Sequence, residues 1–228
     1  MSRTSRYASI ADLPKTLPIF PLPGVLLLPR GRLPLNIFEP RYLAMTGDAL
    51  GGDRLIGMVQ PTDPNASLAA IPSGPQTPVY PIGCAGRITQ WSETEDGRYL
   101  ITLIGICRFV IASELPVTPS GYRRIATAYD RFADDLVAPG EGAIDRARLV
   151  PALKSFFARR QLKANWEAIE KASDDGLVTA LAMVCPFEPS EKQALLESPD
   201  VVARARLLQA LLEMGQHAQG AGSDAKPQ

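Results

Sequence analysis

The chain has 228 residues, of which 46% are apolar, and its 24 acidic side chains balance its 24 basic ones. A chain of this length buries one large core or two modest ones. The zero formal charge argues against a protein that coats nucleic acid or an anionic membrane, because both tasks usually leave a net basic surface. The amino terminus lacks the apolar region of a secretory signal, and no apolar stretch approaches the roughly 20 residues that span a bilayer, so we expect a cytoplasmic protein without membrane segments.

Residues 17–42 combine a strongly apolar sequence with six prolines. Proline fixes φ and removes a backbone donor, so this segment cannot be one long helix and is expected to be extended chain. Three short apolar pieces, 17–22, 25–28 and 33–38, are predicted as strands, with glycines between them as flexible points. The leucines at 26, 27 and 28 are assigned to the core.

The sequence from Phe38 onward predicts a change from strand to helix. Pro40 suits the first helical position, and Glu39 places negative charge at the positive end of the helix dipole. Phe38 and Leu43 occupy the positions of a hydrophobic staple. A helix over residues 40–50 is therefore predicted.

A strand over 54–60 and a long loop over 61–78 are predicted next. Loops of this length in compact domains tend to be binding elements or disordered. The Asp-Gly pair within 95–98, flanked by apolar segments at 83–91 and 98–111, predicts a tight hairpin.

The second arm of this hairpin is almost continuously apolar over 99–106, which a strand tolerates when both of its faces are covered. We therefore expect a curled or closed sheet, with Gly83, Gly86 and Gly105 supplying the bends or bulges that closure requires. Residues 122–132 are predicted as one further strand.

From about Asp134 onward, apolar residues recur at helical spacing. Three stripes are predicted as buried helix faces: Leu149, Leu153, Phe156 and Phe157, then Leu177, Leu181 and Val184, and finally Val201, Ala205, Leu208 and Leu212. Pro151 must either start or kink the first of these helices. Ser190 and Ser198 are predicted as the caps of the last two helices.

Two parts of the chain resemble the Lon protease amino-terminal domain, also called the Lon substrate-binding domain. The first is the apolar, proline-rich opening that leads into a Phe-Glu-Pro-Arg-Tyr signature, which stands here without substitution as Phe38, Glu39, Pro40, Arg41 and Tyr42. The second resembles the family's Lys-Gln-x-Leu-Leu-Glu helix and the Asp-Val-x-x-Arg element after it, here Lys192, Gln193, Leu195, Leu196, Glu197, Asp200, Val201 and Arg204.

The predicted fold class is α+β, because a β-rich part precedes an all-α part. The resemblance implies a PUA-like β-barrel followed by a C-terminal helical bundle. We expect residues 1–133 to form the barrel subdomain, 134–217 the helical subdomain and 218–228 a disordered tail.

We expect no catalytic site, cofactor or metal. The sequence contains no phosphate-binding G-x-x-x-x-G-K-[ST] loop, and Lys154 and Ser155, as helix neighbours, point too far apart to act as a nucleophile and base pair. The one histidine, His217, is expected at a helix end, where a cation complements the dipole. The three cysteines, Cys84, Cys107 and Cys185, have no disulfide or zinc spacing and are predicted to be small buried hydrophobes.

Arg30, Glu39, Arg41 and Tyr42 are the candidate partner-binding residues. One interpretation makes the Glu39 and Arg41 cluster an ion pair or cap that fixes the junction between strand and helix. The other makes all four residues the rim of a peptide-binding surface, since arginine and tyrosine are favoured interface anchors. The sequence leaves both open.

The resemblance implies a non-catalytic module that binds polypeptide clients or a protein partner, as an accessory in protein degradation. An alternative is RNA binding, since PUA-like barrels can bind RNA and six arginines lie on or near predicted strands. These are Arg87, Arg98, Arg108, Arg123, Arg124 and Arg131. The balanced charge and the lack of an aromatic RNP motif weigh against nucleic acid. The ligand and the oligomeric state are left open.

Overall fold

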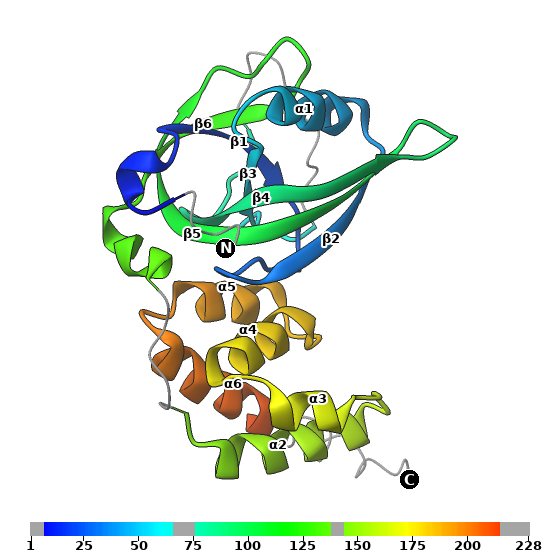
Figure 1. The fold of residues 1–228 in the computed structure, drawn as a ribbon, viewed down its shortest axis with the longest axis vertical. Coiled ribbons are helices and arrows are strands. Elements are labelled where there is room, and N and C mark those ends of the chain that lie inside the picture. The colour runs from blue at the N-terminus through cyan, green and yellow to red at the C-terminus, as the bar shows by residue number, and fades with distance from the viewer. Residues whose placement is uncertain (1–6, 66–75, 138–143, 215–228) are drawn as a thin grey trace, which may run out of the picture.

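The computed structural model describes residues 7–65, 76–137 and 144–214. Much of the predicted loop over 61–78, together with His217 and the predicted tail, lies outside the described residues. The strands gather in one half of the molecule, and the helices of the second part of the chain gather in the other half (Figure 1).

The described strands form one sheet that closes on itself. They are β1 (Thr16–Pro21), β2 (Arg32–Ile37), β3 (Leu55–Val59), β4 (Ile82–Glu93), β5 (Tyr99–Leu115) and β6 (Arg123–Ala128). Their order is β2-β5-β4-β3-β1-β6, and β6 also pairs with β5. We call the resulting ring of β1, β3, β4, β5 and β6 the closed sheet. β2 is an additional strand that pairs with the first half of β5.

Glycines lie where the closed sheet bends. The register between β4 and β5 shifts next to Gly86, which pairs with Gly105. A Cβ on Gly105 would collide with the backbone oxygen of Leu28, and one on Gly83 would collide with the backbone of β3. The predicted bulge is confirmed at the pair of Gly86 and Gly105. Gly83 lies in regular register, and glycine is needed there because neighbouring atoms leave no space for a side chain.

The predicted strand conformation over 25–28 is wrong, whereas the predicted burial of its leucines is confirmed. Residues 25–28 have no strand hydrogen bonding, yet Leu26, Leu27 and Leu28 are buried in the core. Pro23 and Pro29 bracket this segment and remove backbone donors at both ends, so it forms no strand pairing. Its last carbonyl, that of Leu28, accepts from the Gly31 N–H at 2.9 Å.

Helices cover the ends of the closed sheet and build the second half of the molecule. They are η2 (Ile10–Asp12), α1 (Pro40–Gly51), η3 (Asp130–Leu136), α2 (Arg146–Arg159), α3 (Trp166–Lys171), α4 (Asp174–Val184), α5 (Pro189–Glu197) and α6 (Val201–Met214). Helix α1 lies across the end of the closed sheet that is farthest from α2–α6 (Figure 1). We call α2–α6 the helical part. Within the described residues, no helix combines the length and hydropathy needed to cross a bilayer.

Helix α5 begins two residues earlier than the sequence predicts. Glu188 is its cap and forms a capping box with Glu191, whereas the sequence predicts Ser190 as the cap. Pro189 occupies the first helical position, where its fixed φ starts the helix and overrides the serine signal.

Other boundaries also differ from prediction. Asp200 caps α6 by accepting from the N–H of Ala203 at 2.8 Å, where Ser198 is the predicted cap. The predicted strand over 122–132 ends with β6 and continues as the 3-10 helix η3. Helix α3 is not predicted, and Pro151 lies inside α2.

Buried polar side chains fasten α5 to the closed sheet. The Gln193 amide donates to the Ile82 carbonyl at 3.1 Å and accepts from the Gln60 amide at 3.2 Å. The Lys192 ammonium donates to the Gly24 carbonyl at 2.7 Å. Because unpaired polar groups are costly in a core, these bonds hold the two halves in one arrangement.

Candidate functional site

Arg30 connects the closed sheet to the helical part. Its Nε and Nη2 donate to the two carboxylate oxygens of Asp175 at 3.0 and 3.3 Å, and its Nη1 donates to the Asp135 carbonyl at 2.8 Å. Its backbone is left-handed, with φ of 64°, a conformation that costs a non-glycine residue roughly 1–2 kcal/mol. These contacts favour a structural role for Arg30.

Glu39, Arg41 and Tyr42 cluster at the start of α1. The Arg41 guanidinium donates to the Glu39 carboxylate at 2.7 Å and lies 4.4 Å above the centre of the Tyr42 ring. The Tyr42 ring is buried and packs at 4.2 Å between centroids against Phe20. Burial raises the pKa of Tyr42 to about 12. The cluster therefore fixes the junction between β2 and α1.

The structure does not bring Arg30 to this cluster. Arg30 precedes the first residue of β2, and Glu39 follows its last, and a strand of this length spans on the order of 20 Å. The four candidate residues therefore lie at the two ends of β2 and do not form one rim.

Exposed apolar side chains lie beside β2, on both faces of the β4–β5 hairpin, and the sequence did not point to them. Phe38, Trp91 and Leu100 are large apolar side chains with 61%, 52% and 46% of their surface exposed. Trp91 contacts Tyr99 edge to face at 6.0 Å, and the Arg98 guanidinium lies 6.0 Å from the Phe38 ring centre. We call the end of the β4–β5 hairpin, with β2 and Phe38, the arm.

The arm corrects one inference drawn from the sequence. The apolar run over 99–106 is predicted to be covered on both faces, and this holds from Ile101 onward, where β5 runs into the core. Leu100 precedes that point, near the start of β5, where it pairs with Ser92 of β4. The β4–β5 hairpin extends past the closed sheet (Figure 1). Arg98 and Thr102, which share a face with Leu100 by strand alternation, are polar, and this was the available signal. The continuous apolar run hid it.

A shallow groove of about 490 Å³ follows the arm. Its floor is formed by three neighbouring strands, with Pro34, Leu35 and Asn36 from β2, Leu100, Ile101 and Thr102 from β5, and Gln90, Trp91 and Ser92 from β4. Strands carry Trp91, Leu100 and the groove, so binding here would order little extra chain.

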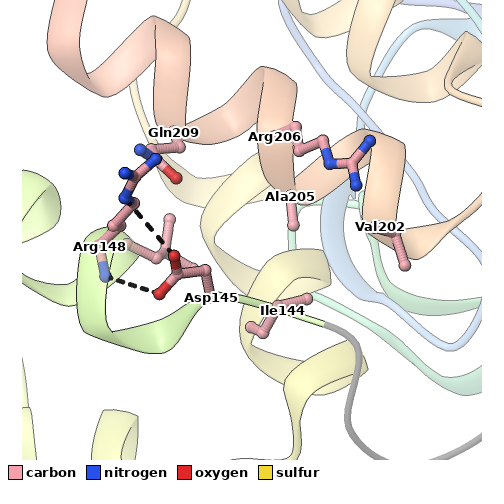
Figure 2. Close-up of a pocket in the computed structure, with 8 residues that line it drawn as sticks. Ile144, Asp145, Arg148, Val202, Ala205, Arg206 and Gln209 are labelled. Carbon is pink, nitrogen blue, oxygen red and sulfur yellow. Dashed lines mark hydrogen bonds and ion pairs between the residues drawn. The ribbon is translucent and has the colours of Figure 1, made fainter.

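A second hollow, between α2 and α6, is more polar. It has a volume of about 260 Å³. Figure 2 shows the Asp145 carboxylate facing the N–H and the guanidinium of Arg148, while the Arg206 guanidinium points away from this pair. Asp145 is used as the cap of α2, and its charge partly offsets that of Arg148. This hollow therefore lacks the apolar surface of the arm.

The cysteines are buried and unpaired, as predicted. Burial raises the pKa of Cys107 and of Cys185 to about 12, and it raises that of Cys84 well above its usual range. Thiols with such pKa values are poor nucleophiles and poor metal ligands. In the parts of the chain that the structure describes, no three His, Cys, Asp or Glu side chains gather as a metal site.

Two of the six arginines considered for RNA binding are buried. Arg108 binds the Asp135 carboxylate at 2.8 Å, and Arg123 forms an ion pair with Glu114 and donates to the Thr77 carbonyl at 2.8 Å. Buried, bonded guanidinium groups are unavailable for phosphate.

The fold and the arm define a class: a closed sheet with a docked helical part, presenting apolar side chains on rigid strands. Residues 16–214 match the family described as the ATP-dependent protease La (LON) substrate-binding domain. The chain belongs to this family.

Relatives and solved structures agree with this assignment. The chain is 26% identical to Lon protease 2 of Myxococcus xanthus over 88% of its own length and 24% of that protein, and 26% identical to Lon protease of Anaeromyxobacter dehalogenans over 88% and 23%. It thus spans about a quarter of the length of these relatives.

Two solved structures share the fold. One is a Lon N-terminal domain protein from Xanthomonas campestris, with a TM-score of 0.56 and 20% identity, over 86% of this chain and 97% of that one. The other is the N-terminal domain of Mycobacterium avium complex Lon protease, with a TM-score of 0.59 and 17% identity, over 87% and 98%.

Proposed function

We propose that this chain binds unfolded polypeptide through the arm and serves as an accessory in protein degradation. The observation that carries the proposal is the exposure of three large apolar side chains on the arm, in a chain of a substrate-binding family. Trp91 and Leu100 lie on the two faces of the β4–β5 hairpin, and Phe38 directly follows β2. In this proposal the closed sheet is a PUA-like barrel subdomain over 1–133, and the helical part is a bundle subdomain over 134–217.

The physical basis is the difference between folded and unfolded partners. Burying an apolar side chain of this size is worth roughly 1.5–3 kcal/mol when complete, and the three arm residues start about half exposed. A folded partner hides its own apolar side chains, whereas an unfolded chain displays them. The arm therefore favours unfolded chains without reading a particular sequence.

Glu39 and Arg41 are proposed as a polar rim beside Phe38. Their ion pair lies directly after Phe38 in the chain, and the Glu39 side chain is 43% exposed. A polar rim around apolar contacts is typical of interfaces. The contacts of Arg30 and Tyr42 support a positioning role at either end of β2.

RNA binding is the weaker alternative. The burial of Arg108 and Arg123 removes two of the arginines that suggested it. If RNA were the ligand, binding would weaken steeply as the salt concentration rises. We expect no retention of a mixed-sequence single-stranded RNA at low salt, and strong, salt-dependent retention would overturn the polypeptide proposal.

The proposal is tested with reduced, carboxymethylated ribonuclease A as an unfolded probe. The triple variant Phe38→Ser, Trp91→Ser and Leu100→Ser is expected to bind this probe at least about tenfold more weakly by isothermal titration calorimetry, because the apolar contact surface is lost. Val184→Ser is the control. The sequence predicted Val184 on a buried helix face, but the structure corrects this: the apolar side chain is 76% exposed at the end of α4. Equal affinities for the triple variant and the control would contradict the proposal.

A further inference from the structure

β2 has one free edge. It pairs with β5 and is the terminal strand in the sheet order, so no described strand lies along its other side. Its two ends are fixed by Arg30 and by the start of α1, which keep the strand extended. A terminal strand presents unpaired N–H and C=O groups at regular spacing.

The register shows which backbone groups face outward. The Gly105 N–H donates to the Gly31 carbonyl at 2.9 Å, so residue 31 faces β5. Because ladder bonds alternate along an antiparallel pair, Leu33, Leu35 and Ile37 also face β5. The backbone groups of Arg32, Pro34 and Asn36 therefore point to the free edge, and the side chains of these three residues are exposed.

Pro34 fits this assignment. It lies at a position whose missing N–H would point away from β5, which is where a strand tolerates proline. The edge then offers two donors, from Arg32 and Asn36, and three carbonyl acceptors. Proline and charged residues on an edge strand also hinder the open-ended strand pairing that leads to aggregation, so this edge suits a short partner.

Apolar side chains lie on both faces next to this edge. Strand alternation puts Pro34 and Asn36 on one face and Leu33 and Leu35 on the other. Leu100 and Trp91 lie one and two strands farther from the edge, on β5 and β4. A strand added beside β2 would place successive side chains on alternate faces, next to Pro34 and Asn36 on one face and next to Leu33 and Leu35 on the other.

We infer that the free edge of β2 accepts an extended segment of a polypeptide as an added strand. An extended backbone has N–H and C=O groups at the spacing that matches those of the edge. Hydrogen bonds between backbones do not depend on side chains, so many sequences can bind in this way. The inference rests on the proposed function and specifies how the arm holds a polypeptide. Apolar residues at every second position of the segment would contact Leu33 and Leu35, which are partly buried against the core.

The test uses a short synthetic peptide of alternating valine and threonine, with lysine at both ends. Asn36→Pro removes an outward donor and fills the space of the added strand, while no bond to β5 is lost. It is expected to weaken peptide binding at least about tenfold. Glu95→Pro is the matched control. It places a proline in the hairpin turn of the same arm, at the second residue of the turn, where proline is favoured. It is expected to leave the affinity unchanged.

A second readout does not depend on a variant. Amide hydrogen exchange of the peptide bound to the unaltered chain is expected to show protection at every second residue, because one edge of an added strand is bonded. If unfolded ribonuclease and the peptide both bind but the two proline variants are equal and protection does not alternate, strand addition is overturned and the proposed function stands. If neither ligand binds, both are overturned.

Discussion

Arg108 is one of the buried side chains that join the two halves of the molecule. Its Nε and Nη2 bind the Asp135 carboxylate at 2.9 and 2.8 Å, and its Nη1 donates to the Leu196 carbonyl, at the end of α5, at 3.0 Å. The Arg108 and Asp135 side chains are 4% and 10% exposed. Arg108→Met is expected to lower the free energy of unfolding by about 3–5 kcal/mol in urea denaturation, because it leaves a buried carboxylate without its partner.

The control for Arg108→Met is Lys171→Met. Lys171 pairs with Glu167 on α3, and both side chains are 75% exposed. Solvent screens such a pair, so its loss is expected to cost less than about 1 kcal/mol. Similar losses for the two variants would contradict the role given to Arg108.

Tyr42 makes the stability sensitive to alkaline pH. Burial raises its pKa from 10.0 to about 12, so the folded state favours the protonated phenol. Its contribution is complete below about pH 10 and is lost as the pH rises toward about 12. Urea denaturation at stepped alkaline pH is expected to show a steeper decline for the unaltered chain than for Tyr42→Phe. Parallel declines would show that Tyr42 does not carry this effect.

The sequence predicted local residue relationships better than distant ones. Glu39, Arg41 and Tyr42 are adjacent in the chain, and Pro40 marks the helix that joins them, so their cluster could be anticipated. Arg30 binds residues that lie 105 and 145 positions further along. No local pattern encodes such contacts, because they depend on how the helical part docks.

Among the elements, β5 shows most clearly what closes the sheet. A Cβ on Gly105 would collide with the Leu28 carbonyl oxygen, which is backbone and cannot move aside. Gly105→Ala is expected to lower the free energy of unfolding by at least about 2 kcal/mol in urea denaturation.

Gly47→Ala is the matched control for Gly105→Ala. A Cβ on Gly47, inside α1, would meet no atom within 4 Å. Alanine there is expected to raise the free energy of unfolding by roughly 0.5–1 kcal/mol, because it lowers the entropy cost of the helix. A stability change of the same sign for both variants would contradict the assignment of Gly105 to a packed crossing.

Element starts followed competing local signals. Near the start of α5, both Ser190 and Pro189 are signals for a helix start. The helix begins at the proline, because its φ is already helical. At residues 25–28 the apolar content indicated a strand, but the flanking prolines left it irregular. The sequence thus predicted the burial of these residues correctly. Their backbone conformation depended on the flanking prolines, which lack N–H donors.

For the whole molecule, the order of a β part followed by an α part could be predicted, and the location of the arm could not. An apolar run reads the same whether it fills a core or forms a contact surface. β5 pairs with β6 from Val110 onward, whereas its first residues, which include Leu100, pair with β2 and with the end of β4. The sequence therefore predicted Leu100 as a core residue, and the strand pairing of β5 was needed to correct this.

The central claim is that unfolded polypeptide binds at the arm, and Trp91 reports on it directly. The chain has two tryptophans, so Trp166→Phe leaves Trp91 as the only one. We expect its fluorescence to shift to shorter wavelength when tryptophan-free unfolded ribonuclease A is added, because the ring leaves water, and to stay constant with the native enzyme. An unchanged Trp91 spectrum at saturating unfolded ribonuclease would contradict the account.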